Sequence, residues 1–276
     1  MKKKLRIGLR YFSLIAVSMI MGAPLAWMFV TSLKTQEEAV GSKFSLHVSN
    51  PQWSNYIKVF KEYNFDSYIA NTLFVALTIS VVTVILAALA AYALNFTNFK
   101  GRKLVFVIFI FSMFLPTHMT LIPGYILLAK FQWLDTFRGL IIPSCISGFS
   151  IFLMNQGFKQ MPKSIIEAAK CDGASHLSIL FRIVLPLMVP TMITLGIITF
   201  TYQYNSYTWP LIITSGERVR TVSLALAKFV QNEGGYGTQW SQMMAANTVS
   251  ILPVLILFLV LQKYYVKGVM HQGLKD

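Results

Sequence analysis

The stretch from Ser164 to Pro190 contains the most informative combination of residue types and spacing in this chain. It is polar and helix-forming, and it lies between hydrophobic segments that are long enough to span a bilayer. Ser164 and Glu167 have the spacing of a capping box, in which a hydroxyl and a carboxylate satisfy free backbone amides at a helix start. Asp172 and Gly173 are expected to end that helix, since glycine readily adopts the left-handed conformation. A membrane protein can use such a module to bind a soluble partner.

A second short helix is expected after this turn, with Ser175 as its cap. Its apolar side chains recur at helical spacing: Leu177, Leu180, Phe181 and Val184. Pro186 and Pro190 mark the start of the following membrane segment. The whole stretch is therefore predicted to form a helix–turn–helix along one membrane face. From the residues alone, the stretch could equally be an amphipathic connector at the membrane surface, in which Glu167 caps the first helix and Gly173 ends it.

Side chains that could carry catalysis or bind a metal ion are few and scattered. Cys145 and Cys171 are too few and too poorly placed to form a disulfide framework. The four histidines lie in different segments and lack ligand spacing: His47, His118, His176 and His271. A nucleotide-binding P-loop is also missing, because the nearest fragment, Gly41–Lys43, lacks the required pattern. The sequence therefore predicts no metal site, no catalytic site and no ATPase within this chain.

Polar and aromatic residues inside the hydrophobic segments form a second candidate site, a substrate pathway. The candidates are Thr117, His118, Thr201, Asn205, Tyr207 and Trp209. Thr201, Asn205 and Trp209 share one helix face at three-to-four spacing. Asn205 can exchange hydrogen bonds with a hydroxyl group, and the aromatic rings offer flat faces for a sugar ring. Thr117 and His118 lie where proline interrupts a hydrophobic segment and frees backbone groups. Alternatively, the polar residues bind neighbouring helices and the aromatic residues form an interfacial belt.

Composition places the chain in a membrane. Of its 276 residues, 55% are hydrophobic and only 12% are charged, and the mean hydropathy is +0.59. Soluble domains carry about a quarter charged residues. The formal net charge of +14 would suggest nucleic acid in a soluble protein, but the cations lie in loops between hydrophobic segments. Their role is therefore to set membrane topology, and the expected surroundings are lipid, with no nucleic-acid partner.

Six hydrophobic segments are long enough to cross a bilayer, which takes roughly 20 apolar residues. They are Tyr11–Thr31, Ile69–Leu94, Leu104–Leu128, Gly139–Phe158, Leu187–Ile213 and Met244–Leu261. Pro116 and Pro123 interrupt the third segment. The fourth is the weakest, because it is short and contains Pro143 and Gly148. The expected fold is an all-α membrane protein with six transmembrane helices, and a five-span alternative would place the two termini on opposite sides.

Lysine and arginine residues are unevenly distributed between alternate loops. With the N-terminus inside, the inner segments contain 15 of them and the longer outer segments contain 9. The positive-inside rule therefore places both termini in the cytoplasm, together with the segment around Gly173. The N-terminus, MKKKLR followed by an apolar run and GAPLA, also has features of a signal peptide. Its apolar run of about 20 residues is longer than a usual signal sequence, which favours an uncleaved first span.

The residues around Gly173 match a longer spaced pattern. The sequence E-A-A-K-C-D-G-A runs from Glu167 to Ala174 and is followed by Ile183, Leu185 and Pro186. This pattern resembles the EAA loop of permease subunits of binding-protein-dependent ABC importers. Further motifs resemble the carbohydrate-uptake branch of that family, and with them the resemblance covers nearly the whole chain: L-P-x(6)-P at Leu115–Pro123, W-P-L at Trp209–Leu211 and Q-K-Y-Y-V-K-G at Gln262–Gly268.

The resemblance implies that the EAA loop, between spans four and five, forms a cytoplasmic coupling segment that docks in a groove of an ATPase. The docking residues would be Glu167, Ala168, Ala169, Asp172, Gly173 and Ala174. It also implies three regions along the chain: an N-terminal span and outer loop over 1–67, an importer transmembrane core over 68–266 and a cytoplasmic tail over 267–276.

The resemblance further implies a bacterial cytoplasmic-membrane protein that imports a sugar or oligosaccharide by alternating access. This chain would be non-catalytic and hold no cofactor, because a separate ATPase dimer would bind ATP and Mg. A second homologous permease would complete the pathway, and a periplasmic or extracellular solute-binding protein would deliver cargo to the outer loops, especially Ile213–Met244. Glycerol-phosphate or a related polyol is the alternative cargo.

An ion-coupled secondary transporter is the alternative from another class. Such proteins place ionisable residues near the membrane midplane and often contain internal repeats. The sequence contains neither feature, apart from His118. The absence of charged residues from the spans also favours a neutral sugar over an anionic cargo.

Overall fold

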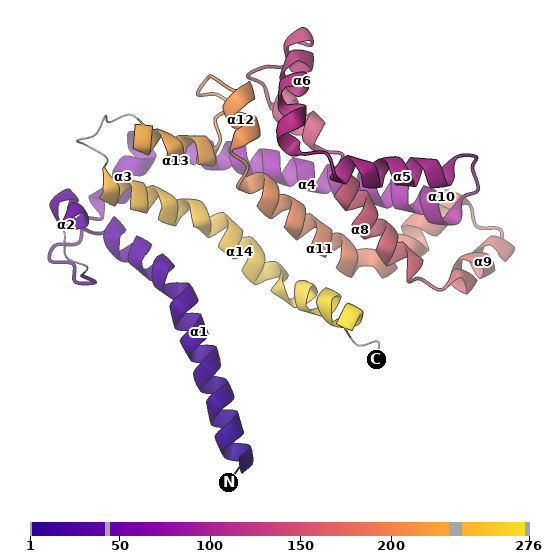
Figure 1. Ribbon diagram of the computed structural model, residues 1–276, viewed down its shortest axis with the longest axis horizontal. Coiled ribbons are helices and arrows are strands. Elements are labelled where there is room, and N and C mark those ends of the chain that lie inside the picture. Colours follow the sequence, from indigo (N-terminus) through magenta and orange to yellow (C-terminus); the bar gives the residue numbers. More distant parts are fainter. Residues whose placement is uncertain (1, 42–44, 232–238, 274–276) are drawn as a thin grey trace. The chain divides into compact units, whose positions relative to one another are not determined.

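The computed structural model describes the backbone of residues 2–41, 45–231 and 239–273. This part of the chain folds into helices joined by turns and loops, without a strand (Figure 1). An all-helical fold satisfies the backbone hydrogen bonds inside each segment, which lipid requires of any helix that spans it. The prediction of an all-α fold is confirmed. Parts of all three predicted regions fall outside the described residues: 1 and 42–44 in the N-terminal region, 232–238 in a later outer loop of the core, and 274–276 in the tail.

Four helices are long and apolar enough to cross a membrane: Arg6–Ser32, Phe65–Phe96, His176–Tyr204 and Trp240–Gln262. Two further spans are present if each of two bent helix pairs counts as one. The first pair, α5 (Arg102–Met113) and α6 (Thr117–Lys130), is bent by 104°. The second pair joins α7 (Phe137–Ile141) and η1 (Ile142–Ser144) to α8 (Gly148–Lys159) with a bend of 42°. The described residues thus contain four to six candidate spans, against the six predicted.

The chain divides into two compact units, Met1–Ile69 with Leu224–Pro253, and Ala70–Ser223 with Val254–Asp276. The first contains α1 (Lys2–Ser32), α2 (Gln36–Val40), α3 (Ser54–Lys61), most of α13 (Val222–Gln231) and the first parts of α4 (Phe65–Phe96) and α14 (Trp240–Gly273). Hydrogen bonds tie its elements together. Asn55 of α3 donates to the carbonyl of Ser32 at 2.9 Å, and Tyr63 donates to Gln242 at 3.0 Å.

In the second unit, the core forms where other helices pack against α4. Its small residues Ala87, Ala88 and Ala91 are at most 2% exposed, which lets neighbouring helices approach closely. The same core contains residues of α8, α9 (Lys163–Cys171) and α11 (Leu185–Tyr204). Helix α8 also packs against α5 and α11. This core therefore joins the apolar helices to the polar segment between α8 and α11.

The fifth span begins earlier than the predicted Leu187–Ile213. The helix runs unbroken from α10 (His176–Ile179) through a π-helical turn, η2 (Leu180–Val184), into α11. Within this turn, the amide of Leu185 donates to a carbonyl five residues back. The wider turn lets the helix pass Pro186, which lacks an amide donor and crowds the preceding turn. The expected separate second helix is therefore wrong, since it is the first part of this long helix.

Candidate functional site

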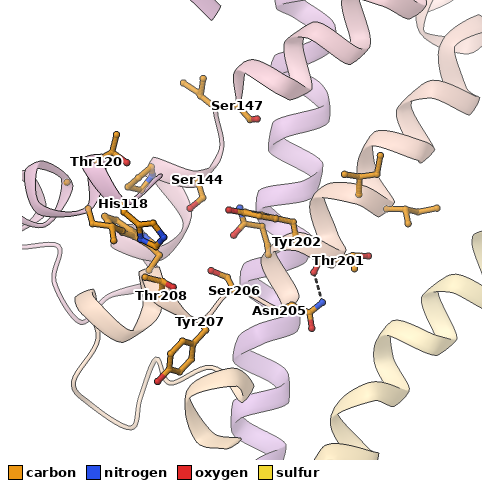
Figure 2. Close-up of a pocket in the computed structure, with 18 of the residues that line it drawn as sticks. His118, Thr120, Ser144, Ser147, Thr201, Tyr202, Asn205, Ser206, Tyr207 and Thr208 are labelled. Carbon is orange, nitrogen blue, oxygen red and sulfur yellow. Dashed lines mark hydrogen bonds between the residues drawn. The ribbon is translucent and has the colours of Figure 1, made fainter. Parts of the chain in front are cut away.

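Residues beside three helix breaks of the second unit line a cavity of about 1310 Å³ (Figure 2). α5 and α6 are separated at Phe114–Pro116, and η1 and α8 are separated at Cys145–Ser147. α11 is separated from α12 (Thr208–Ile213) at Asn205–Tyr207. Non-helical backbone at membrane depth is tolerated where it is buried in protein or lines a water-filled cavity. The breaks therefore direct polar groups into one space.

The lining combines hydroxyl, amide and aromatic side chains with aliphatic ones. Its polar and aromatic members include His118, Thr120, Ser144, Ser147, Thr201, Tyr202, Gln203, Asn205, Ser206, Tyr207, Thr208 and Trp209. Among the described residues, no Lys, Arg, Asp or Glu lines this cavity, and no cluster of three His, Cys, Asp or Glu side chains could hold a metal ion. Hydroxyl and amide groups both donate and accept hydrogen bonds. The arrangement therefore suits binding of a neutral, hydroxyl-rich ligand.

Five of the six residues predicted to form a substrate pathway border this cavity: His118, Thr201, Asn205, Tyr207 and Trp209. The side chain of the sixth, Thr117, lies outside the described part of the structure. His118 is on α6 and Thr201 on α11, so only folding brings them to one space. Figure 2 shows them on different helices around it. That these residues contact the cargo stays a prediction.

Asn205 ends α11 instead of continuing the predicted helix face to Trp209. Its side-chain nitrogen donates to the carbonyl of Thr201 at 2.8 Å (Figure 2). This bond occupies a donor of the amide and leaves the side-chain oxygen to accept a hydrogen bond from a ligand. The predicted single face is therefore wrong beyond Asn205, because the helix stops there and restarts as α12.

Trp209 holds α12 against two other helices. Its indole N–H donates to the carbonyl of Gly139 at 3.2 Å. Its ring lies against Gly124, where a Cβ would come within 3.0 Å of the indole, and α12 contacts both α7 and α6. Since the indole has a single N–H donor, a ligand in the cavity can contact only its ring. Trp209 thus combines a structural role with the predicted stacking surface.

The sequence reasoning missed the hydroxyl groups at the second break. Ser144 and Ser147 line the cavity, and Ser147 also caps α8 by accepting from the amide of Ser150 at 3.4 Å. The signal was present, since Pro143 and Gly148 weakened the fourth predicted span. The argument that selected polar residues beside the prolines of the third segment applies equally here.

The predicted docking segment forms a helix that ends in a tight turn. Asp172 is the C-cap of α9, and Gly173 follows it with φ of +76°. The amide of Gly173 donates to the carbonyl of Lys170, and the amide of Ala174 donates to that of Ala169, both at 3.0 Å. These two bonds define a Schellman motif, which requires a left-handed residue after the cap. The prediction that Asp172 and Gly173 end the helix is confirmed.

The predicted capping box that begins at Ser164 is wrong. Helix α9 starts at Lys163, with Pro162 at the N-cap and no side-chain cap. Ser164 therefore lies inside the first turn, because the extended backbone of Pro162 immediately precedes the helix. Ser175 caps α10 as predicted, and it accepts from the amide of Ser178 at 3.3 Å.

The predicted docking residues differ in exposure. Glu167, Ala168, Asp172 and Gly173 are exposed. Ala174 is half-buried, whereas Ala169 is 8% exposed and belongs to the same core as Ile166. Ala169 therefore holds the segment against the other helices and offers little surface to a partner.

Side-chain contacts join this segment to α4, and α4 to α8. The hydroxyl of Tyr92 on α4 lies 3.1 Å from Nδ1 of His176, the first residue of α10. Asn95 of α4 donates to Asn155 of α8 at 2.7 Å. Asn155 is 2% exposed, so this hydrogen bond lies in the core. These contacts and the shared apolar core connect the segment around Gly173 to α4 and α8.

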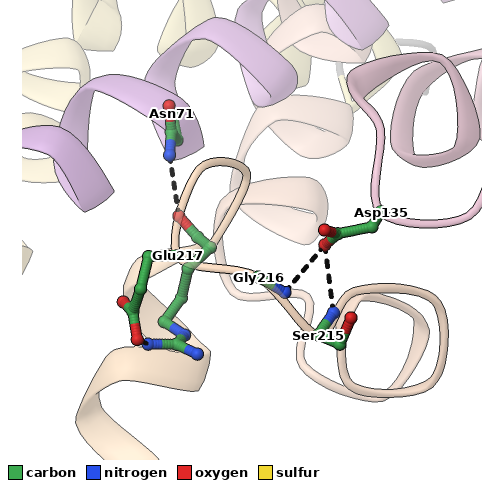
Figure 3. Close-up of polar contacts among 6 residues, drawn as sticks. Asn71, Asp135, Ser215, Gly216 and Glu217 are labelled. Carbon is green, nitrogen blue, oxygen red and sulfur yellow. Dashed lines mark hydrogen bonds and ion pairs between the residues drawn. The ribbon is translucent and has the colours of Figure 1, made fainter.

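The segment that follows α12 is also held by hydrogen bonds (Figure 3). The carboxylate of Asp135 accepts from the amides of Ser215 and Gly216 at 3.0 and 2.9 Å. Asn71 of α4 donates to the carbonyl of Arg220 at 3.1 Å. A hydrogen bond to an ionised carboxylate is stronger than one between neutral groups, so this pair of bonds stabilises the turn. The first part of the predicted outer loop is therefore anchored to the second unit.

Comparison with known proteins identifies related transport proteins. A family model described as "Binding-protein-dependent transport system inner membrane component" matches residues 83–271. The trehalose/maltose transport system permease protein MalG of Thermococcus litoralis is 31% identical over 91% of this chain and 91% of its own. The sn-glycerol-3-phosphate transport system permease protein UgpE of Pectobacterium atrosepticum is 30% identical over 95% of this chain and 96% of its own.

Solved structures contain the same fold. A chain of a bacterial ABC transporter involved in the import of the acidic polysaccharide alginate has a TM-score of 0.83. It is 24% identical, and the match covers 96% of the present chain and 98% of that chain. A chain of the bacterial alginate transporter in complex with its alginate pentasaccharide-bound periplasmic protein has a TM-score of 0.64 at 17% identity. At these identities the likeness shows the fold alone.

Proposed function

Because the chain belongs to the family of binding-protein-dependent transport system inner membrane components, we propose that it is the permease subunit of an ATP-driven sugar or oligosaccharide importer. It is a multi-pass protein of the cytoplasmic membrane. The observation that carries the proposal is the uncharged, hydroxyl-rich cavity of about 1310 Å³ beside three helix breaks. Typical small-molecule sites occupy about 300–1,000 Å³, so this cavity has room for more than one sugar ring.

Glycerol-phosphate is the second candidate cargo, because a relative named for its transport is 30% identical. The lining favours a neutral sugar. A phosphate group is usually bound by Arg or Lys through charge-assisted hydrogen bonds, and the described residues contribute neither to this cavity. A relative named for trehalose and maltose is similarly close, at 31% identity.

Transport would occur by alternating access, driven by a separate cytoplasmic ATPase dimer that binds ATP and Mg. The exposed carboxylates of Glu167 and Asp172 and the Schellman turn at Gly173 form the proposed docking surface. Tyr92 and His176 then connect this surface to α4. In this arrangement six spans would be present, and both termini and the docking segment would face the cytoplasm.

The remaining partners follow from the same mechanism. A second homologous permease would complete the pathway, and an extracellular or periplasmic solute-binding protein would deliver the cargo. The anchored residues Ser215 and Gly216 support a receiving surface in the outer loop, since they are held in place by Asp135. The transmembrane core would span 68–266, between an N-terminal region over 1–67 and a cytoplasmic tail over 267–276.

An ion-coupled secondary transporter is disfavoured by family membership and by the cavity itself. Ion coupling commonly uses ionisable residues in the substrate pathway. His118 is the one imidazole in the described lining, which contains no Lys, Arg, Asp or Glu. Energy from a separate ATPase therefore remains the better-supported source.

The test is uptake by the complete importer in proteoliposomes: this permease, its partner permease, the ATPase dimer and the binding protein. Labelled maltooligosaccharides and other oligosaccharides would be compared with glycerol-3-phosphate, with ATP inside the vesicles. We expect ATP-dependent uptake of a sugar, abolished when the P-loop Lys of the ATPase is replaced. Uptake of glycerol-3-phosphate alone would overturn the sugar assignment, and uptake driven by an ion gradient without ATP would overturn the importer class.

A further inference from the structure

Five cations of the second unit gather around the loop between α4 and α5. They are Lys100, Arg102, Lys103, Lys159 and Lys170, and we call them the basic cluster. The first three border a shallow cavity of about 520 Å³ formed by residues 98–103. Arg102 donates to the carbonyl of Thr97 at 3.3 Å. Its guanidinium is therefore held beside the loop while its other N–H groups remain available.

The other two cations come from different helices, and their contacts place one beside α5 and the other at the end of α4. Lys159, at the end of α8, places Nζ 5.2 Å from the ring centroid of Phe106 on α5. Lys170, on α9, donates to the carbonyl of Phe96 at 3.5 Å. The rings of Phe96 and Phe158 stack with their centroids 6.1 Å apart, which brings the ends of α4 and α8 together. The cluster therefore joins α4, α5, α8 and α9.

The basic cluster carries five positive charges, and the carboxylates nearest to it along the chain, Glu167 and Asp172, belong to the same segment as Lys170. None of the five cations forms an ion pair with a described carboxylate. Like charges repel each other, and a bound anion relieves that repulsion. The cluster therefore has the charge of an anion-binding surface.

The basic cluster adjoins an apolar surface. Leu104, Ile108 and Phe111 of α5 are 65%, 58% and 68% exposed, and Phe99 within the loop is 41% exposed. An apolar helix face of this kind can pack against acyl chains in a membrane. Cations at the end of an apolar helix face meet lipid headgroups at the level of the phosphates.

We propose that the basic cluster binds the headgroup of an anionic phospholipid, whose acyl chains lie along the exposed face of α5. Arg102 and Lys159 would bind the phosphate from two helices, because charge-assisted hydrogen bonds to phosphate are strong. A lipid bound there joins the loop after α4 to α8 and to the docking helix α9. The proposed lipid site does not depend on which cargo the importer carries.

The test uses the complete importer in nanodiscs of phosphatidylcholine with a graded fraction of phosphatidylglycerol. Native mass spectrometry measures the phosphatidylglycerol fraction at which half of the complexes retain this lipid. Removal of one cation costs about fivefold in attraction to an anionic surface. We therefore expect Arg102→Gln and Lys159→Gln each to raise the half-saturating fraction about fivefold. Lys130→Gln, which removes an exposed cation at the end of α6, is the matched control and should change nothing.

Lys100→Gln is the second variant, because the side chain of this exposed loop residue makes no hydrogen bond to a described residue, so the substitution should leave the fold intact. It should also weaken lipid retention while the complex elutes as a single assembled species. Lipid retention equal to wild type in all three cluster variants would overturn the proposal. A loss of retention in the control Lys130→Gln as large as in the cluster variants would also overturn it. Lost ATPase association with unchanged lipid retention would also overturn it and would mark a protein-docking surface. Lipid retention is measured without cargo, so failure here is distinct from failure of the sugar assignment.

Discussion

The cavity and the proposed docking segment are assembled in opposite ways. The docking segment is one continuous stretch, Lys163–Cys171 followed by the turn at Gly173, and its shape comes from hydrogen bonds between near neighbours. The cavity is lined by residues as distant in the chain as His118, Ser147 and Asn205. A substitution in the segment therefore alters the shape of the backbone, whereas a substitution in the cavity removes one of many side chains that could contact a ligand.

This difference predicts different responses to mutation. The turn at Gly173 depends on one backbone conformation, so it should respond to substitution in an all-or-none manner. The lining offers many hydroxyl and amide groups, so a single loss should lower transport by a limited factor. Four substitutions distinguish these two kinds of response.

Gly173→Pro should reduce uptake to background while leaving membrane insertion intact. Proline cannot adopt a φ of +76°, and it removes the amide that donates to Lys170. Gly173→Ala should be milder, since the left-handed conformation costs about 1–2 kcal/mol for an L-residue. Gly41→Pro is the control, because this glycine also ends a helix but has φ of −54°. Normal uptake in Gly173→Pro, measured in the reconstituted importer, would remove the turn from the coupling mechanism.

Glu167→Lys should prevent stable docking of the ATPase and abolish uptake. We expect the exposed carboxylate to meet basic residues in the groove of the ATPase, so a cation in its place would be repelled. Co-purification of the ATPase measures the effect directly. Glu62→Lys, at the exposed C-cap of α3, makes the same charge reversal elsewhere. Equal ATPase recovery in both variants would show that Glu167 has no part in docking.

Asn205→Leu should lower uptake about two- to tenfold, because a hydrogen bond is worth about 0.5–1.5 kcal/mol. ATPase association should be unchanged. Asn247→Leu is the matched control, since Asn247 makes the same bond to a carbonyl four residues back, at 2.9 Å, but lies outside the cavity. An uptake rate equal to wild type in Asn205→Leu would exclude this residue from the pathway.

Tyr92→Phe should have the smallest effect, lowering uptake relative to ATP hydrolysis about two- to fivefold. It removes only the hydroxyl contact with His176 at 3.1 Å and keeps the ring in the core. The ratio of transported sugar to hydrolysed ATP measures this coupling. Tyr63→Phe removes a hydrogen bond to Gln242 in the first unit and should leave the ratio unchanged. A decrease of equal size in both variants would indicate general destabilisation.

The docking segment was largely predictable because its main features are local. Asp172, Gly173 and Ser175 have conformational preferences that act within a few residues, and the structure bears out the helix end and the second cap. The start of α9 was predicted wrongly, since Pro162 displaced Ser164 from the capping position. The burial of Ala169 depends on packing that motif spacing does not describe.

The cavity was predictable only in part. Polar residues near proline suggested His118, and helical spacing suggested Thr201 and Asn205, all of which border it. The same spacing wrongly continued the helix to Trp209. Ser144 and Ser147 were missed, although proline and glycine flank them. All of these residues line one cavity because of the way α6, α8 and α11 pack.

Composition and local residue preferences were enough to predict a helical membrane protein with an acidic turn at Asp172–Gly173. Hydrophobic burial in lipid and short-range backbone preferences act on each segment separately. The packing of the helices determines which of them continue or break, which polar groups share the cavity and which cations lie beside α5. Those outcomes depend on contacts between residues far apart in the chain, such as Asn95 with Asn155 and Lys159 with Phe106, and composition or spacing does not specify such contacts.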